Sequence, residues 1–153
     1  MDLTMTILTA AKAAKVSGSL LLAVCSHESG GFTMNYAAHD HGSPSIGSCQ
    51  IKYKTAQMLG FHGVPDDLMN PAVNAMWAAK YLAYQQDRYG ENSWIKLTAS
   101  YNAGSYVESK KVPGCPRNLA YVKKVQAYLE PGLQDRLSCG VQVQFYAQSK
   151  EWH

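Results

Sequence analysis

The sequence predicts a single, mainly α-helical domain with one small β element. Its 153 residues, 46% of them hydrophobic, are enough to build one globular domain with a core. Charged residues make up only 16% of the chain, which is not the composition of a disordered protein or a coiled coil. Apolar residues recur at helical spacing in several segments, whereas the short segment 45–51 suits a small hairpin.

Two helices are expected before residue 30. Apolar residues at helical spacing mark the first one: Ile7, Leu8, Ala11 and Ala14. Ser17-Gly18 ends that pattern, and a second helix is expected to begin near Ser19. One stripe of this second helix contains Leu21, Val24, Cys25 and Glu28. The carboxyl group therefore continues a core-facing stripe, and Gly30-Gly31 permits a left-handed exit from the helix.

The middle of the chain should alternate between loops and short elements. Thr33 to Pro44 is expected to be a polar loop, and Ser45 to Ile51 a small hairpin. Lys54 to Leu59 has the pattern of a short helix that Gly60 stops. Asp66-Asp67 follows Pro65 and is most simply a turn before the next helix.

The clearest helix signal is Asn70-Pro71, an N-cap residue followed by a proline that suits the first helical position. Residues at helical spacing continue this helix to Gly90: Val73, Met76, Trp77, Tyr81, Tyr84 and Arg88. Ser93 can cap a further helix that stops near Gly104. Tyr121 to Leu129 forms the last expected helix, ended by Pro131-Gly132, and the tail from Leu133 fits a strand, a short helix or a packed coil.

Glu28 is the strongest candidate for chemistry. Because it ends an apolar stripe, partial burial should disfavour its charged form. The negative end of the helix dipole acts in the same direction. Both effects would raise the pKa of the Glu28 carboxyl group, as a general acid at neutral pH requires. The plainer alternative is a glutamate that only caps or salt-bridges a helix end.

Three short motifs occur in order along the chain. They are Glu28-Ser29-Gly30-Gly31-Phe32, then Ser45-Ile46-Gly47-Ser48-Cys49-Gln50-Ile51, then Ala99-Ser100-Tyr101-Asn102-Ala103-Gly104. Together they resemble the E-S-x-x-F, S-x-G-L-M-Q-I and A-Y-N-A-G motifs of the soluble lytic transglycosylases, which are related to goose-type lysozymes. The resemblance covers about Leu20 to Leu129, and Tyr121-Val122 resembles the Y-V of a fourth, looser motif.

This resemblance implies a lysozyme-like α+β fold with a hairpin beside an active-site cleft. It also implies cleavage of the glycan strands of bacterial peptidoglycan with one glutamic acid. Glu28 would protonate the oxygen between N-acetylmuramic acid and N-acetylglucosamine, while the substrate's N-acetyl group stabilises the developing positive charge. The Glu28 carboxylate would then take the proton of the C6 hydroxyl, which closes a 1,6-anhydro ring without water.

The resemblance assigns the other site residues by position. Ser29, directly after the acid, would support the helix end. Ser45 and Gln50 would line the sugar groove beside the acid. Gly47 would let the backbone approach the glycan closely.

The later motifs supply the rest of the implied site. The Tyr101 hydroxyl would contact the catalytic carboxyl group or the substrate, and Asn102 would fix the local turn. Tyr121 would lie close to the acid. The family's Leu-Met is replaced by Ser48-Cys49, which predicts a smaller and more polar groove floor.

Neither a metal nor any other cofactor is expected. His39-Asp40-His41 invites a metal site, but such a stretch in a loop is more often solvated. His27-Glu28 does not begin an H-E-x-x-H motif, because Gly31 stands where the second histidine would be. Glycoside cleavage usually needs two carboxyl groups. Candidates for a second acid, by residue type alone, are Asp40, Asp66 and Asp67.

The four cysteines show no C-x-x-C spacing, so structural zinc is not expected. Cys25 lies in an apolar helical pattern and is most simply a small core residue. Spacing leaves disulfides open for Cys25, Cys49, Cys115 and Cys139. The lack of a secretory signal at the N-terminus makes them less expected.

Charge and hydropathy limit the partners. The net charge of +3 would help adsorption to an anionic cell wall. Lys110-Lys111 and Lys123-Lys124 are the only basic clusters, so a nucleic-acid partner is not expected. No apolar run is long enough for a membrane span. Delivery inside a phage particle, through a lysis hole or within a secretion apparatus is expected instead, unless the chain is part of a longer protein.

Two other functions remain open from the sequence. The first is a hydrolysing lysozyme on the same fold, in which water replaces the C6 hydroxyl. The second is a catalytically silent glycan-binding or structural component of a particle.

Overall fold

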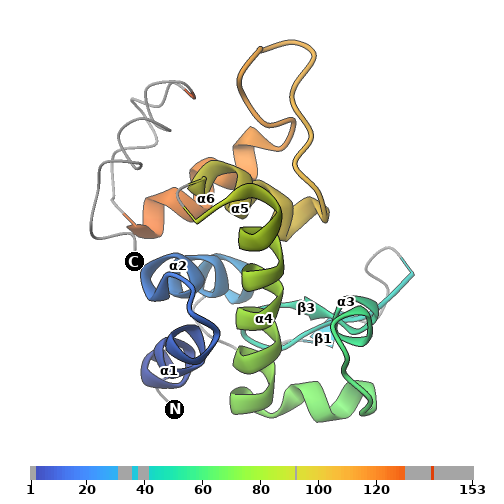
Figure 1. The fold of residues 1–153 in the computed structure, drawn as a ribbon. Helices are drawn as coiled ribbons and strands as arrows, with labels where there is room; N and C mark the ends of the chain where they lie inside the picture. Colours follow the sequence, from blue (N-terminus) through green and yellow to red (C-terminus); the bar gives the residue numbers. More distant parts are fainter. Residues whose placement is uncertain (1–2, 31–35, 38–41, 92, 130–138, 140–153) are drawn as a thin grey trace.

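The computed structural model describes residues 3–30, 36–37, 42–91, 93–129 and 139. The helix α4 (Pro71–Tyr89) runs through the middle of this part of the chain (Figure 1). Two helices, α1 (Thr4–Ala14) and α2 (Gly18–Ser29), pack on one side of it. The small sheet and α3 (Tyr53–Met58) lie on the other side.

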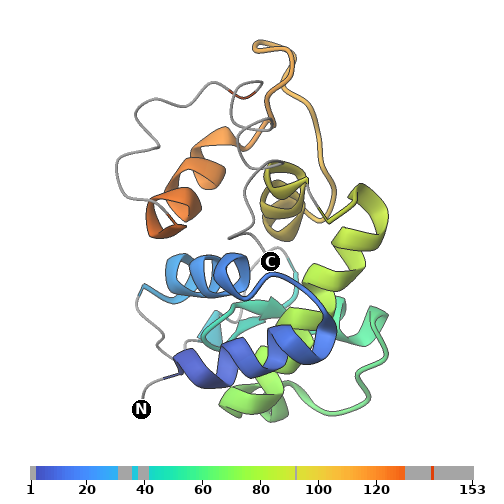
Figure 2. The same ribbon diagram turned by 60° about the vertical axis from the view of Figure 1, so that its left-hand side comes forward.

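The remaining helices, α5 (Trp94–Ala103) and α6 (Leu119–Leu129), pack together at one end of α4. Figures 1 and 2 both show α6 directly above α2, and residues of the two helices are in contact. A short 3-10 helix, η1 (Pro65–Met69), leads into α4. The expected mainly α fold with a small β element is confirmed.

The sheet is antiparallel and has the strand order β1-β2-β3. Its strands are β1 (Tyr36–Ala37), β2 (Ser45–Ile46) and β3 (Ile51–Lys52). β2 and β3 form the hairpin that the sequence predicted, with Ser45 opposite Lys52. The interpretation of residues 33–44 as a loop was wrong at β1, which pairs with β2. A strand this short has too few residues to show the alternation by which strands are recognised.

The helix that carries Glu28 has the predicted ends. Ser17 is the N-cap of α2, and its hydroxyl accepts a hydrogen bond from the backbone N–H of Leu20 at 3.2 Å. Gly30 ends the helix with φ +65°, the left-handed conformation that glycine adopts without strain. The stripe before the acid is fully buried: Leu21, Val24 and Cys25. Glu28 itself is partly buried at the edge of the core.

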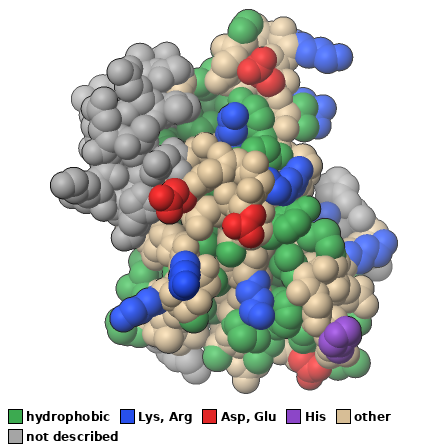
Figure 3. All heavy atoms as spheres, viewed as in Figure 1, with side chains coloured by type: hydrophobic (Ala, Val, Ile, Leu, Met, Phe, Trp, Pro, Cys, Tyr) green, Lys and Arg blue, Asp and Glu red, His purple; other side chains and the backbone are tan. Residues whose placement is uncertain are grey.

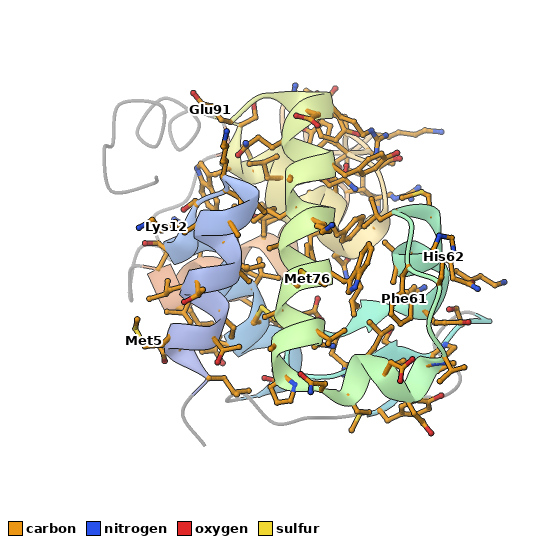
Figure 4. The ribbon with its side chains drawn as sticks, turned by 60° about the horizontal axis from the view of Figure 1, so that its bottom comes forward. Met5, Lys12, Phe61, His62, Met76 and Glu91 are labelled. Carbon is orange, nitrogen blue, oxygen red and sulfur yellow. A yellow bond between two sulfur atoms is a disulfide. The ribbon has the colours of Figure 1, made fainter. Side chains whose placement is uncertain are left out.

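The helix α4 begins as predicted but buries a different face. Asn70 caps it by accepting from the N–H groups of Ala72 and Val73. Small and amide side chains form much of its buried face: Asn74, Ala75, Ala78, Ala79 and Gln85. Met76, part of the expected apolar series, is 41% exposed. A central helix must let neighbouring helices approach on more than one side, and small residues permit this. Figure 4 shows α1 with Met5 on one side of α4, and Phe61 and His62 on the other.

Two smaller expectations at helix ends have different outcomes. Ser93 precedes α5 but forms no side-chain cap; its hydroxyl donates to the carbonyl of Tyr89 at 2.7 Å instead. Gly104 ends α5 as predicted. Pro131-Gly132 and the tail lie outside the described residues, apart from Cys139.

All four cysteines form disulfides, Cys25–Cys49 and Cys115–Cys139. Cys25 is fully buried, as expected of a core residue, and its disulfide with Cys49 is one that the sequence left open. Sequence spacing could not reveal this pair, because the fold alone brings α2 and the β2–β3 loop together.

Among the described residues on the face in Figure 3, lysine and arginine side chains lie at several separate places, with neutral and acidic side chains between most of them. None of the helices described here is long and apolar enough to cross a membrane.

Candidate active site

A cleft of about 300 Å³ opens beside Glu28. It lies between the end of α2, the sheet and the helices α3, α4 and α5. The described residues that line it are Glu28, Ser45, Gln50, Ile51, Lys52, Thr55, Tyr81, Tyr101, Asn102, Ala103 and Gly104. The cleft therefore joins residues from all three sequence motifs, which lie far apart along the chain.

Glu28 is held from the side of α6. The Tyr121 hydroxyl donates a hydrogen bond to Oε2 of Glu28 at 2.8 Å. Burial, the nearby charge of Glu28 and this hydrogen bond raise the pKa of Tyr121 well above its ordinary value. The phenol therefore stays protonated and remains a donor. Tyr121 lies close to the acid, as the fourth motif predicted.

The ring of His27 packs edge-on against the ring of Tyr121, with 5.2 Å between centroids. It also lies 6.4 Å from the ring of Tyr128. Burial, and then the positive charge of Lys124, lower the pKa of His27 below its ordinary value of 6.5. A neutral imidazole thus supports the ring that contacts the acid. The packing of His27 against Tyr121 was not predicted from the sequence, although His27 is the immediate neighbour of Glu28.

The last turn of α2 is closed by Ser29. Its buried hydroxyl donates to the carbonyl oxygen of Cys25 at 2.9 Å. This bond lies within the helix turn that carries Glu28, which is consistent with the support expected of Ser29.

The loop from Ser45 to Gln50 forms one wall of the cleft. Ser45 and Gln50 both line it. Gln50 has a left-handed backbone, φ +49°, and its side-chain amide donates to the carbonyl of Gly47 at 3.0 Å. A non-glycine residue in this region is uncommon and marks a tightly constrained turn. The turn thus holds the Gln50 side chain against its own backbone.

Gly47 has a packing role that the sequence did not indicate. It is not among the described residues that line the cleft. Its φ of +85° favours glycine, and a Cβ atom there would collide with the side-chain amide of Asn74. The glycine therefore makes room for a buried side chain of α4, and its close approach to glycan stays a prediction.

Tyr101 lines the cleft, but its hydroxyl has a different partner from the two expected. The hydroxyl donates to the carbonyl oxygen of Cys49 at 2.8 Å and is buried. Burial, and then the charges of Glu28 and Tyr81, raise the pKa of Tyr101 well above its ordinary value. Tyr101 therefore ties α5 to the β2–β3 loop.

Asn102 lines the cleft next to Tyr101. Its side-chain oxygen accepts a hydrogen bond from Nδ2 of Asn118 at 2.9 Å, and the same nitrogen also donates to the carbonyl of Ala99. Asn118 therefore orients Asn102 and joins the start of α6 to α5. Asn118 was not predicted as a site residue, because it lies between the third and fourth motifs.

Three polar cleft residues outside the sequence motifs were missed as site residues: Lys52, Thr55 and Tyr81. A signal existed for Lys52, because in the expected hairpin it pairs with Ser45, and directly opposite residues of an antiparallel pair lie on the same face. The Tyr81 hydroxyl donates to the carbonyl of Ser100 at 3.1 Å, which ties α4 to α5 below the cleft.

Glu28 is the only carboxyl group among the described residues that line the cleft. Asp67 instead accepts a hydrogen bond from the N–H of Val64 at 2.9 Å, as expected of a turn residue. Asp66 lies beside it in η1. Asp40 lies outside the described residues.

The described part of the chain contains no group of three His, Cys, Asp or Glu side chains that could hold a metal ion. The proposed loop of His39, Asp40 and His41 falls outside that part.

A helical fold with a small antiparallel sheet beside a cleft, and a glutamate at a helix end within it, defines the lysozyme-like α+β class. The family model described as "Transglycosylase SLT domain" matches residues 5–113, and the chain belongs to this family. The family is one of lytic transglycosylases, and its substrate is peptidoglycan of the bacterial cell wall. A comparison with solved structures gave no match.

Proposed function

We propose that the protein cleaves the β-1,4 bond between N-acetylmuramic acid and N-acetylglucosamine by transglycosylation, with Glu28 as acid and then as base. The observation that carries this proposal is Glu28, the lone carboxyl group among the described residues that line the cleft, held by the Tyr121 hydroxyl. Hydrolysis usually needs a second carboxyl group, either as nucleophile or to activate water. A transglycosylase needs no such group, because the substrate supplies the attacking oxygen.

In the first step, the protonated Glu28 gives its proton to the glycosidic oxygen, and the bond from C1 of the muramic residue to that oxygen breaks. The N-acetylglucosamine part leaves with a new hydroxyl group. The carbonyl oxygen of the muramic N-acetyl group stabilises the positive charge at C1. Tyr121 favours this step by fixing the position of the carboxyl group.

In the second step, the Glu28 carboxylate accepts the proton of the C6 hydroxyl as O6 bonds to C1. The product is a 1,6-anhydro ring, and Glu28 is again protonated for the next cycle. No water is consumed. The Tyr121 hydrogen bond stabilises the carboxylate that exists between the steps.

The polar side chains of the cleft are proposed to hold the glycan. Ser45 faces it from β2, Gln50 from the β2–β3 loop, and Asn102 from the end of α5. Amides and hydroxyls suit sugar hydroxyl and N-acetyl groups, because they both donate and accept hydrogen bonds.

The cysteine chemistry supports action on the outer side of the cytoplasmic membrane. Disulfides persist in the periplasm and outside the cell, whereas the cytosol keeps thiols reduced. All four cysteines here are paired. Delivery with a phage particle or a secretion apparatus stays a prediction.

The decisive experiment is mass spectrometry of the first products released from purified sacculi. An anhydro end is lighter by one water than a hydrolysed end, and 1,6-anhydro-N-acetylmuramic ends are expected. Reducing N-acetylmuramic ends before any secondary processing would assign the chain to the hydrolysing lysozymes. A zymogram with no clearing under conditions where the protein is folded would indicate a silent glycan-binding component.

A further inference from the structure

Cys49, in the β2–β3 loop, is bonded to residues of three helices. Its backbone N–H donates to Oδ1 of Asn74 on α4 at 3.1 Å. Its carbonyl accepts from Tyr101 on α5, and its sulfur is bonded to Cys25 on α2. Gln50, the next residue, lines the cleft.

Asn74 contacts this loop from a position outside the cleft. Its side chain is fully buried, and it is not among the described residues that line the cleft. Its Nδ2 donates to the carbonyl of Ile46 at 2.7 Å and to that of Leu68 at 3.0 Å. One amide therefore satisfies backbone groups on both sides of the turn and one in η1.

The turn is also shaped around this side chain. Gly47 closes directly over the Asn74 amide, where any other residue would place a Cβ atom in collision with it. The carbonyl of Gly47 in turn accepts from the Gln50 side chain. The position of Gln50 thus depends, through Gly47 and Cys49, on the amide of Asn74.

We propose that Asn74 is a positioning residue for glycan cleavage: it holds the turn 46–49 so that Gln50 stays at a constant place relative to Glu28. This inference rests on the proposed function. Asn74 touches neither the acid nor the cleft, so its effect acts through the loop backbone. Small misplacements of a positioning group can cost a large part of the rate.

The test compares three variants with the wild type. Asn74→Asp keeps the shape and the acceptor for Cys49 but lacks both N–H donors. Asn74→Ser removes the whole amide and serves if the first variant does not fold. Leu82→Ala is the matched control, because Leu82 is a fully buried residue of the same helix and its truncation costs stability without altering the turn.

Each folded variant is assayed well below its melting temperature, by kcat and KM on soluble glycan strands and by hydrogen exchange of the Cys49 amide. For Asn74→Asp we expect kcat/KM to fall by about 10-fold to 100-fold, chiefly in kcat. Exchange at Cys49 should accelerate in the Asn74 variants. Leu82→Ala should match the wild type in both measurements.

A pH series adds a readout that a cavity alone would not change. Protonation gives the introduced carboxyl group one donor again. The loss of kcat/KM in Asn74→Asp relative to wild type should therefore become smaller as the pH falls. The loss of kcat/KM in Asn74→Ser should not change in this way.

Equal kcat/KM for wild type and both Asn74 variants would overturn the inference, as would an equal loss in Leu82→Ala. A wild type without any glycan-cleaving activity would instead contradict the proposed function. Hydrogen exchange of the Cys49 amide would then still show whether Asn74 holds the turn.

Discussion

The hydroxyl of Tyr121 donates a hydrogen bond of 2.8 Å to Oε2 of Glu28, although 93 positions separate the two residues in the sequence. The contact exists because α6 packs against α2 (Figure 2). Tyr121 also lies beyond residues 5–113, the segment that the family model matches. The helix that follows this segment therefore completes the surroundings of the acid.

Tyr121→Phe should lower kcat/KM by about 10-fold to 100-fold, since hydrogen bonds to charged groups contribute about 1.5–3 kcal/mol. The ring and its packing against His27 would be retained. A hydrogen bond donated to a carboxylate favours its charged form, so removing it favours the protonated acid. The alkaline limb of the pH–rate profile should therefore move to higher pH.

The matched control for this variant is Tyr128→Phe. Tyr128 lies on the same helix and also contacts the His27 ring, but its side chain is 52% exposed. The pH–rate profile of Tyr128→Phe should coincide with that of the wild type. An unchanged profile in Tyr121→Phe would show that the bond to Glu28 has no catalytic effect.

Glu28→Gln should remove lysis of purified sacculi and leave the melting temperature nearly unchanged. The amide keeps the shape and can still accept from Tyr121, but it cannot give a proton to the leaving oxygen. General acid–base groups typically contribute about 10² to 10⁴-fold, and here one residue is proposed to fill both roles. Near-normal activity in a folded variant would contradict the assignment of Glu28.

The two disulfides allow a paired experiment, because both join residues 24 positions apart. Loops of equal length give the same chain-entropy contribution, about 3 to 4 kcal/mol in that model. Cys25→Ala with Cys49→Ala, and Cys115→Ala with Cys139→Ala, should therefore lower stability by similar amounts in denaturant titrations.

Activity should separate the two double variants. Cys25–Cys49 joins the helix of Glu28 to the loop of Gln50, whereas neither Cys115 nor Cys139 is among the described residues that line the cleft. At a temperature where both variants are folded, only the loss of Cys25–Cys49 should reduce kcat/KM. Equal activities would mean that the loop is held sufficiently by its hydrogen bonds.

Acid should destabilise the fold through His27, whose pKa is lowered by burial and then by Lys124. As the pH falls, the unfolded chain binds a proton at His27 before the folded protein does. Stability from this group is therefore complete above the ordinary value of 6.5 and declines as the pH falls from there to the lowered pKa.

His27→Gln should reduce the slope of the unfolding free energy against pH in this window, measured by urea titration. His62→Gln, at an exposed histidine on the opposite side of α4, is the control (Figure 4). Equal slopes in wild type and His27→Gln would exclude His27 as the source of acid sensitivity.

Local chemistry made much of the fold predictable. Asn70-Pro71 predicts a helix start, and Gly30 and Gly104 predict helix ends, because caps and left-handed exits depend on a few neighbouring residues. The hairpin of β2 and β3 was likewise predictable from one short segment. Tyr36–Ala37 was not, because its strand exists only through pairing with β2.

The motifs, similarly, placed Glu28, Ser45, Gln50, Tyr101 and Asn102 in one site, and the structure brings all of them to the same cleft. The partners of these residues could not be predicted. The Tyr101 hydroxyl donates to the carbonyl of Cys49 and not to the acid, and Gly47 makes room for the side chain of Asn74. Such pairings depend on side-chain packing between elements.

The sequence by itself determined that Glu28 is an acid at the end of an apolar helix stripe. It also determined the places where most helices begin and end, and the segments that carry the motifs. All of these depend on neighbours along the chain. The tertiary structure alone decided that Cys25 bonds to Cys49, that Asn74 lies beneath the turn and that Tyr121 contacts Glu28. These contacts join residues that are between 24 and 93 positions apart. Only the packing of α4 and α6 against the remaining elements brings such residues within bonding distance.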